Sequence, residues 1–430
     1  MFLKNLLKKQ WLLGCVAAAG MLTVGTGQAS ALELDLFETM NVDSIFGSSC
    51  GDTCGDTCTD TGCGCSLGDC LGGGDSGIDV GGWLQYGYQG DSERRFDLNF
   101  NDKQAGFGSD QRHGLNQAWL YAEKVADGSC GTDFGFRVDA MYGLDADDTQ
   151  AFGASQSWDT DDSFQHGIYG FAIPQLYGEV ANGDWNVKFG HFYTLVGYEV
   201  VTAPDNFFYS HAYTMFNNEP FTHTGALATY TASDNVEIYG GWTAGWDTGF
   251  DRFNDGSSFL GGASVGLGDN VTATTIITAG DLGSRGEGWS SSFVLDVILS
   301  DDLNYVFQMD TVNTNSGGDH QLAINQYLFY TINDKVSAGI RGEWWKTNNF
   351  NSNTTGNAAN DNAQTVGICE VTAGLNIKPL LSTDSCGNTS GDWLTIRPEV
   401  RHDWSTGGDF IDDEAQINYT TFGTDVIITF

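Results

Sequence analysis

Basic residues are scarce in this 430-residue chain, which has 18 lysines and arginines against 56 aspartates and glutamates and a formal net charge of −38. Proteins that bind nucleic acid present a basic face to the phosphates, so this balance excludes nucleic acid as an expected partner. A strongly acidic chain instead attracts cations and repels anions. Acidic loops that only keep the protein soluble are the alternative explanation of the charge.

Proline is scarce as well, with 5 residues, whereas glycine reaches 58 residues and aromatic residues make up 13% of the chain. Disordered chains are typically rich in proline and poor in aromatic residues, so this composition argues against disorder. It favours an all-β fold in which many short strands are joined by turns.

Long apolar runs are absent beyond residue 31, where no stretch of about 18 apolar residues occurs, so we expect no membrane-spanning helix. Residues 1–31 have the three parts of an export signal: a basic start with Lys4, Lys8 and Lys9, the apolar stretch WLLGCVAAAGMLTVG, and the small-residue cleavage site ASA. We therefore expect a signal peptide over residues 1–31. Lipidation of Cys15 is a weaker alternative, because most of the apolar stretch follows that cysteine.

Residues 32–77 are rich in cysteine and contain no histidine. The cysteines lack the paired C-x-x-C spacing of zinc sites, and in an exported chain we expect them to form disulfides. Six cysteines allow fifteen pairings, among which the sequence does not choose. The disulfide candidates of this expected periplasmic segment are Cys50, Cys54, Cys58, Cys63, Cys65 and Cys70.

From residue 78 to the end, apolar and polar residues alternate in segment after segment, which is the period of strands with two unlike faces. In VEIYGGWTAGW, Val236, Ile238 and Trp242 share one face, and Glu237 and Tyr239 share the other. We predict sixteen strands, an even number that returns both ends of the chain to one side of a barrel. Their ranges are 78–89, 115–125, 132–143, 171–180, 185–193, 223–233, 236–246, 257–267, 271–280, 290–300, 303–311, 319–332, 335–346, 370–378, 393–404 and 417–430.

The connections between these strands sort by length. Short turns such as Ser233-Asp234-Asn235 and Asp301-Asp302 alternate with long polar loops such as DTGFDRFNDG and TNNFNSNTTGNAANDNAQTVG. This sorting is typical of a transmembrane β-barrel, whose strands need about 9 to 11 residues to cross the membrane. We therefore predict that residues 78–430 form a transmembrane antiparallel up-and-down β-barrel of about 16 strands, in which the connection 379–392 is unexpectedly long.

The last predicted strand, INYTTFGTDVIITF, has its bulky residues on one parity, and in a membrane barrel that face points to lipid. If this strand pairs with the one that starts near residue 78, no sheet edge is left open in the membrane. We expect it to close the barrel. Its lipid-facing residues would be Phe422, Val426, Ile428 and Phe430.

The polar face of such a barrel points to the lumen. Charged residues there would need complete pairing in a packed core, whereas a wet lumen accommodates them more simply. By strand parity, the predicted lumen wall carries Arg137, Lys188, Arg341, Glu343, Arg397, Glu399 and Arg401, together with Asp139, Glu237, Asp296, Asp310 and Asp425.

Several stretches carry a family resemblance: GGWLQYGY from residue 81, GFRVDAMYG from 135, GHFYTLVGYEVV from 190, PDNFFYSHAYTM from 204, EPFTHTGALATY from 219 and YGGWTAGWDTGFDR from 239. From residue 81 to the end the chain resembles the OmpL-like β-barrel porin family of Gram-negative-type envelopes. The resemblance implies an outer-membrane barrel with porin activity. By resemblance to outer-membrane proteins, the final Phe430 would be the signal that the barrel-assembly machinery reads.

Residues 194–221 form the third long connection if the barrel starts inside the envelope, and in sixteen-stranded diffusion porins the third loop folds into the lumen and narrows it. Acidic side chains on this loop would face basic side chains on the wall and act as a selectivity filter. The basic wall residues are Arg137, Lys188, Arg341, Arg397 and Arg401. The alternative is a plug formed by the loop aromatics Phe207, Phe208, Tyr209, Tyr213 and Phe216. The predicted constriction residues are Glu199, Asp205, Glu219, Tyr209 and Phe216.

We expect neither catalysis nor a firm metal site. Ser210, His211 and Asp205 could be imagined as a hydrolase triad, but sequence neighbours in an extended segment point apart, and no G-x-S-x-G motif occurs. Hard cations bind clustered carboxylates, but the acidic loop residues lack the EF-hand pattern and are only weak calcium candidates. These candidates are Asp145, Asp147, Asp148, Asp159, Asp161 and Asp162; no other cofactor is expected.

The sequence thus predicts a porin in the outer membrane of a Gram-negative-type bacterium. It would form a water-filled channel for passive diffusion of small hydrophilic solutes or ions, with a cation preference. Expected partners are outer-membrane lipid, the barrel-assembly machinery and the solutes; a homo-oligomer is left open. The alternative function is a structural envelope anchor with a disulfide-linked N-terminal segment and acidic loops that bind divalent cations.

Overall fold

The computed structural model describes residues 77–90, 113–153, 156–159, 166–315, 319–350, 364–383, 389–407 and 418–430. The expected signal peptide, the six cysteines of residues 32–77, Asp161 and Asp162 lie outside these ranges, and the predictions for them stay predictions. In the described residues, no helix combines the length and the apolar character that crossing a membrane would require.

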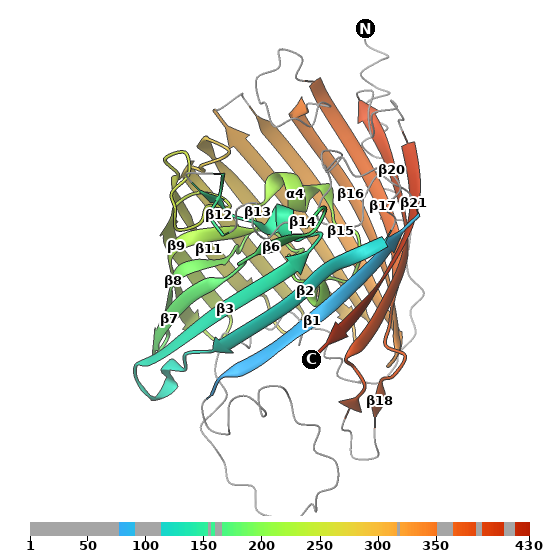
Figure 1. The fold of residues 1–430 in the computed structure, drawn as a ribbon, viewed down its shortest axis with the longest axis horizontal. Helices are drawn as coiled ribbons and strands as arrows, with labels where there is room; N and C mark the ends of the chain where they lie inside the picture. Colours follow the sequence, from blue (N-terminus) through green and yellow to red (C-terminus); the bar gives the residue numbers. More distant parts are fainter. Residues whose placement is uncertain are drawn as a thin grey trace, which may run out of the picture.

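Sixteen antiparallel strands form a closed barrel (Figure 1). Each strand pairs with its neighbour along the chain, and the last pairs with the first, so the predicted barrel of about 16 strands is confirmed. The strands are β1 (Asp79–Gln89), β2 (His113–Lys124), β3 (Asp133–Gly143), β7 (Leu176–Asn182), β8 (Trp185–Tyr193), β9 (Thr222–Ser233), β10 (Val236–Thr243), β11 (Ser257–Gly266), β12 (Val271–Asp281), β13 (Glu287–Ser300), β14 (Leu303–Thr314), β15 (His320–Asn333), β16 (Val336–Phe350), β17 (Gln364–Ile377), β20 (Leu394–Gly407) and β21 (Asn418–Thr429).

One predicted strand, 171–180, is interrupted in the structure. Its first part is β6 (Gly170–Ala172), an extra strand that pairs with β3, and β7 continues along β3 after a three-residue break. The break contains Pro174, which has no N–H to donate to the sheet. The backbone N–H of Asp139 on β3 still donates to Gln175 O at 2.9 Å, so the broken strand stays on its neighbour.

The C-terminal strand closes the barrel as predicted. β21 pairs with β1 from Trp83↔Thr429 to Gln89↔Gly423, and Phe430 and Gly82 exchange two backbone hydrogen bonds of 2.9 Å. The Asp425 side chain is 1% exposed and faces the interior. The exposed outward side chains of this strand and the final residue are Phe422, Val426, Ile428 and Phe430.

Short turns lie at one end of the barrel and long connections at the other. Two-residue turns follow β7, β9, β13 and β15. The connection 379–392, which is long although it lies at the short-turn end, contains the small hairpin β18 (Ser382–Thr383) and β19 (Thr389–Ser390). Figure 1 shows this hairpin projecting beyond the barrel at the end where the C-terminus lies. The hairpin explains the length that the strand pattern leaves unexplained.

The outer surface is apolar and has aromatic residues toward both ends. Leu120 and Phe189 are 53% and 54% exposed on this surface. Trp185 and Tyr230 stack with ring centroids 4.6 Å apart near the short turns, and Trp242, 58% exposed, lies near the long-connection end of β10. An apolar band between aromatic belts is the outer face that a membrane barrel presents to lipid.

Candidate functional site

Residues 194–221, called the internal loop below, connect β8 to β9 and fold into the barrel. The loop contains a short 3₁₀ turn, η4 (Ala203–Asp205), and one short helix, α4 (Tyr213–Asn218). α4 packs against β14, β15 and β16, whereas η4 packs against β21. Figure 1 shows α4 within the ring of strands. The internal loop therefore reaches separate sectors of the lumen wall.

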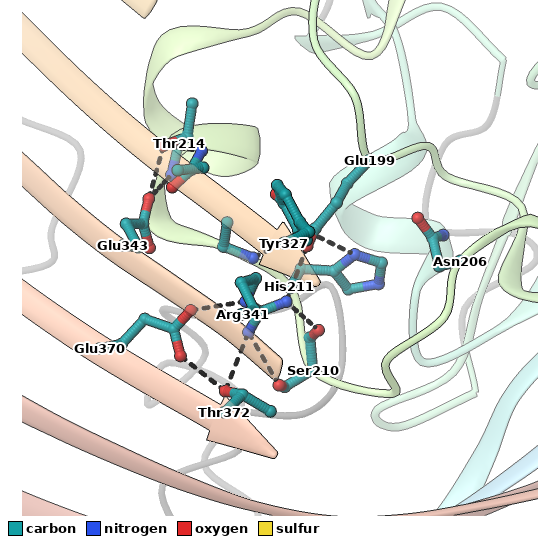
Figure 2. Close-up of polar contacts among 12 residues, drawn as sticks. Glu199, Asn206, Ser210, His211, Thr214, Tyr327, Arg341, Glu343, Glu370 and Thr372 are labelled. Atoms are coloured by element: carbon teal, nitrogen blue, oxygen red, sulfur yellow. Dashed lines mark hydrogen bonds and ion pairs between the residues drawn. The ribbon is translucent and has the colours of Figure 1, made fainter. Parts of the chain in front are cut away.

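Arg341 on β16 contacts both the internal loop and the neighbouring wall (Figure 2). Its Nη1 donates to Glu199 Oε1 and to Ser210 O of the internal loop, both at 2.7 Å. Its Nε donates to Glu370 Oε1 on β17 at 2.5 Å. The Arg341 side chain is fully buried, so one guanidinium joins the loop to two strands of the wall.

Two further arginines on β20 hold the loop by its backbone. Arg397 Nη1 donates to the carbonyl oxygens of Ala203 at 2.8 Å and Asn206 at 2.5 Å, and Arg401 Nη1 donates to His211 O at 2.6 Å. Each arginine also pairs with a wall carboxylate. Arg397 pairs with Asp425 at 2.5 Å, and Arg401 pairs with Asp403 at 2.8 Å.

Two wall glutamates accept hydrogen bonds from backbone N–H groups of the loop. Glu343 on β16 accepts from Tyr213 N and Thr214 N, both at 2.7 Å. Glu399 on β20 accepts from Tyr209 N at 2.7 Å and Ser210 N at 3.1 Å. Charged wall groups thus satisfy both the donors and the acceptors of the loop backbone.

Glycines on the wall make room for three consecutive aromatic side chains of the loop. A Cβ atom at Gly339 would lie 2.4 Å from the Phe207 ring, and one at Gly374 would lie 3.3 Å from the Phe208 ring. A Cβ atom at Gly87 would lie 1.9 Å from the hydroxyl of Tyr209, the next residue of the loop. These side chains therefore lie directly against the wall strands, as the plug alternative of the sequence analysis proposes for them.

Apolar contacts extend the attachment of the loop around the lumen. Val196 packs with Phe192, Leu227 and Leu260 on the wall formed by β8, β9 and β11. Other loop residues join separate clusters: Val201, Ala203, Met215 and Phe221 pack near Trp83 and Trp119, and Phe208 packs with Val306 and Tyr327. The loop is thus attached to the wall by apolar contacts at several separate places.

The three acidic residues predicted on the loop have different environments. Burial alone would raise the pKa of Glu199, but the adjacent Arg341 outweighs it and lowers this pKa to about 2. Burial raises the pKa of Asp205 to about 6, against the effect of a hydrogen bond from Thr202. Burial and the neighbouring Asp310 carboxylate raise the pKa of Glu219 well above its ordinary value. Two of the three acids therefore hold a proton more readily than a free carboxyl group.

The predicted arrangement of acid facing base across an opening is not what the structure shows. Glu199 and Arg341 form a contact ion pair, and Glu199 is 8% exposed. Arg137 pairs with wall carboxylates, one of them Glu123 at 2.9 Å, and in the described part of the chain Lys188 forms no ion pair with the loop. The loop is docked on the wall, because the charges bind each other and the backbone. A constriction by Tyr209 and the acidic residues stays a prediction.

Phe216, the remaining predicted constriction residue, is partly buried. Its ring meets Phe221 edge-on, with centroids 6.1 Å apart, and lies 6.0 Å from the His211 ring. It therefore belongs to the packed part of the loop.

The imagined hydrolase triad is not assembled. Ser210 Oγ accepts a hydrogen bond from Arg341 Nη2 at 3.0 Å, His211 Nδ1 lies 3.4 Å from Glu199, and Asp205 is bound to the threonine that precedes η4. The three side chains have separate partners: Ser210 is bound to the wall, whereas His211 and Asp205 contact residues of the loop itself.

The acidic calcium candidates belong to the second long connection, which contains α3 (Ala146–Thr149) and the hairpin of β4 (Phe152–Gly153) and β5 (Gln156–Ser157). Asp145 accepts hydrogen bonds from Asn116 and Gln117, and Asp159 accepts from two backbone N–H groups at 3.2 Å and 2.9 Å. The described residues contain no group of three or more His, Cys, Asp or Glu side chains arranged for a metal ion. Calcium binding stays a prediction.

Sequence reasoning missed Glu370 and Asp403, the wall partners of Arg341 and Arg401. Strand parity could have found both, because each shares the lumen parity of its strand. The glycines that make room for the aromatic residues carry no comparable signal in a chain with 58 glycines.

The chain is similar, at low sequence identity, to several solved structures. The outer membrane channel DcaP of Acinetobacter baumannii aligns with a TM-score of 0.51 at 10% identity, over 82% of this chain and 97% of that one. An anion-selective porin from Comamonas acidovorans gives a TM-score of 0.50 at 10% identity, over 82% and 99%. OmpT, an outer membrane protein of Vibrio cholerae, gives 0.48 at 12% identity, over 82% and 99%.

No curated protein matches the sequence. A family model does match, over residues 77–430, and it describes the OmpL-like family "beta-barrel porin-2". The match begins just before β1 and runs to the last residue, so it covers the whole barrel. The chain therefore belongs to the OmpL-like β-barrel porin family and is an outer-membrane protein of the Gram-negative type.

Proposed function

We propose that the barrel is a channel through which small hydrophilic solutes or ions diffuse passively across the outer membrane, with a preference for cations. The observation that carries the proposal is the division of the wall into an apolar outer face and an inner face lined with ionisable side chains. In porins, a polar interior of this kind encloses a water-filled channel.

The internal loop limits the size of the solute. It contacts β14, β15 and β16 through α4 and β21 through η4, and its apolar residues reach the wall near β8 and β11. We expect these contacts to leave a narrow path at this level, which would favour inorganic ions and small polar molecules over larger solutes.

The balance of charge in the lumen supports the cation preference. Among the inward-facing side chains of the wall strands and the internal loop, the lysines and arginines are Arg137, Lys188, Arg341, Arg397 and Arg401. Carboxyl groups outnumber them, and include Glu123, Asp139, Glu179, Glu199, Asp205, Glu219, Glu237, Asp296, Asp310, Glu343, Glu370, Glu399, Asp403 and Asp425. An excess of carboxylate attracts cations into the channel.

Conductance in a planar lipid bilayer tests the proposal. We expect stepwise insertion of the folded mature protein, ohmic currents in potassium chloride, and a zero-current potential whose sign reports cation preference. Heat-denatured protein added from the same detergent solution is the control. A barrel that inserts, judged by its protection from protease, but passes no ions would refute the channel.

Such a result would favour the structural alternative, an envelope anchor. That alternative rests on residues 32–77, which lie outside the described part of the chain. No enzymatic activity is proposed. Homo-oligomerisation and calcium binding can be tested on the same preparation, by its mass in detergent and by its melting temperature with and without calcium.

A further inference from the structure

Most charges near the internal loop are compensated by a partner. Arg341, Arg397 and Arg401 each form an ion pair with a wall carboxylate, at 2.5, 2.5 and 2.8 Å, and Glu343 and Glu399 are bound to backbone N–H groups. A compensated charge exerts little field on an ion that passes several ångströms away, because its partner acts with the opposite sign. These groups hold the loop, but they discriminate weakly between cations and anions.

Lys188 on β8 is different. Its Nζ lies 4.7 Å from the centroid of the Tyr177 ring, and no ion pair forms with its cross-strand neighbour Glu179. Glu179 instead accepts from Ala126 N at 2.7 Å and from Asn186 Nδ2 at 3.3 Å. In the described part of the chain, Lys188 therefore has no ion-pair partner at contact distance, while the carboxylates of Glu179 and Glu123 lie within electrostatic reach of its ammonium group.

Two carboxylates across the same part of the lumen are also without a cationic partner in the described residues. Glu237 on β10 accepts a hydrogen bond from the hydroxyl of Tyr239 at 2.5 Å. Asp296 on β13 has one oxygen, Oδ1, that lacks any hydrogen-bond partner among these residues. Both side chains are partly exposed. Asp296 also lies within electrostatic reach of Tyr198, which places it next to the internal loop.

These three charges occupy one region of the lumen, between the internal loop and the short-turn end, called the vestibule below. Lys188, Glu237 and Asp296 lie within about five residues of the short turns 183–184, 234–235 and 301–302, or roughly 17 Å at the rise of a strand. The vestibule thus has a basic edge on β8 and an acidic edge on β10 and β13. Glu219 of the loop is only 5% exposed, so a passing ion approaches the vestibule charges more closely.

We propose that the ion selectivity of the channel is set in the vestibule, by Lys188 opposed to Glu237 and Asp296, rather than by the acidic residues of the internal loop. The proposal rests on the channel function above. Small inorganic cations such as potassium would follow the β10 to β13 side, where Glu237 and Asp296 have no cationic partner in the described residues. Chloride would be held near Lys188, and its passage would be the slower one.

Zero-current potentials in a gradient of potassium chloride test this assignment, with the permeability ratio of potassium to chloride as the readout. We expect the double variant Glu237→Gln/Asp296→Asn to lower the ratio, and Lys188→Gln to raise it. One charge at several ångströms from the path should change the ratio about twofold to threefold at low salt, and less at 1 M salt, where the charges are screened. Glu237→Gln and Asp296→Asn keep the size of the side chain, whereas Lys188→Gln also shortens it.

Lys335→Gln is the matched control, because it removes the same charge from an exposed residue of the turn after β15. It should leave the ratio unchanged. If the internal loop sets the selectivity, Asp205→Asn or Glu219→Gln should give the largest shift and the vestibule variants almost none. That pattern would overturn the inference while the channel stands. If wild-type protein passes no ions at all, the channel function itself fails. Single variants Glu237→Gln and Asp296→Asn replace the double variant if its yield of folded barrel is low.

Discussion

Removal of the Arg341 guanidinium should destabilise the barrel by about 3 to 5 kcal/mol, the range for breaking a buried ion pair from one side. In Arg341→Met, the carboxylates of Glu199 and Glu370 stay buried while the cation that contacts them at 2.7 Å and 2.5 Å is lost. The lower part of this range is expected, because Glu370 keeps Arg401 at 4.0 Å and Glu199 keeps a histidine at 3.4 Å.

The loss can be measured by urea unfolding of the barrel in lipid vesicles, followed by the fluorescence of its tryptophans, all of which lie in residues 83–404. The triple variant Arg341→Met/Glu199→Gln/Glu370→Gln should recover most of the stability, because it removes the buried charges together with their cation. Lys335→Met, on an exposed turn, should change stability by about 0.5 kcal/mol or less. A loss below about 1 kcal/mol in Arg341→Met would show that water reaches the two carboxylates, which would refute their burial in a dry contact.

Three further changes test the attachment of the loop and the closure of the barrel. Burial raises the pKa of Asp205 from its ordinary 3.8 to about 6, so the folded state binds this proton more tightly than the unfolded chain does. The stability of the barrel should therefore fall as pH rises from about 4 to about 6. Asp205→Asn should abolish that part of the pH dependence, up to about 3 kcal/mol, in unfolding experiments at pH 4.5 and 7. Gly87→Ala should displace the Tyr209 ring, lower the free energy of unfolding by about 1 to 3 kcal/mol and change the single-channel conductance. Gly240→Ala is the control, because the added Cβ would have nothing within 4 Å. Deletion of Phe430 should impair assembly in the outer membrane but not export across the inner membrane, since this residue makes two backbone hydrogen bonds to Gly82; equal amounts of protease-resistant barrel with and without it would contradict the prediction.

The strand pattern was sufficient to predict the barrel, because alternation and loop length are local properties of the sequence. Phe422 and Asp425 of the last strand face outward and inward as their parity indicates. Proline chemistry explains the one broken strand: the missing N–H of Pro174 is visible in the sequence, but its effect on the pairing with β3 depends on where the strand lies in the sheet.

The contacts of the internal loop could not be predicted in the same way. Parity indicates that Arg397 points into the lumen, but it does not indicate what the guanidinium meets there. The structure shows backbone carbonyl groups, for example Ala203 O, almost two hundred residues away in the chain. Opposite charges on loop and wall suggested a filter, whereas burial turned Glu199 and Arg341 into a structural contact. Which charges lack an ion-pair partner at contact distance, as Lys188 does in the described residues, depends on side-chain geometry that no pattern of residue types contains.

The wall binds the internal loop chiefly through peptide groups, and this has a consequence for how the loop can vary. The carbonyl groups of Ala203, Asn206 and His211 and the N–H groups of Tyr209 and Thr214 are present whatever side chain the residue carries. Many substitutions at these positions therefore leave the main-chain contacts intact, and proline is the exception wherever an N–H is needed. The side chains that the loop presents to a passing solute can thus change by mutation while the position of the loop is kept. One barrel can therefore be adapted to different solutes.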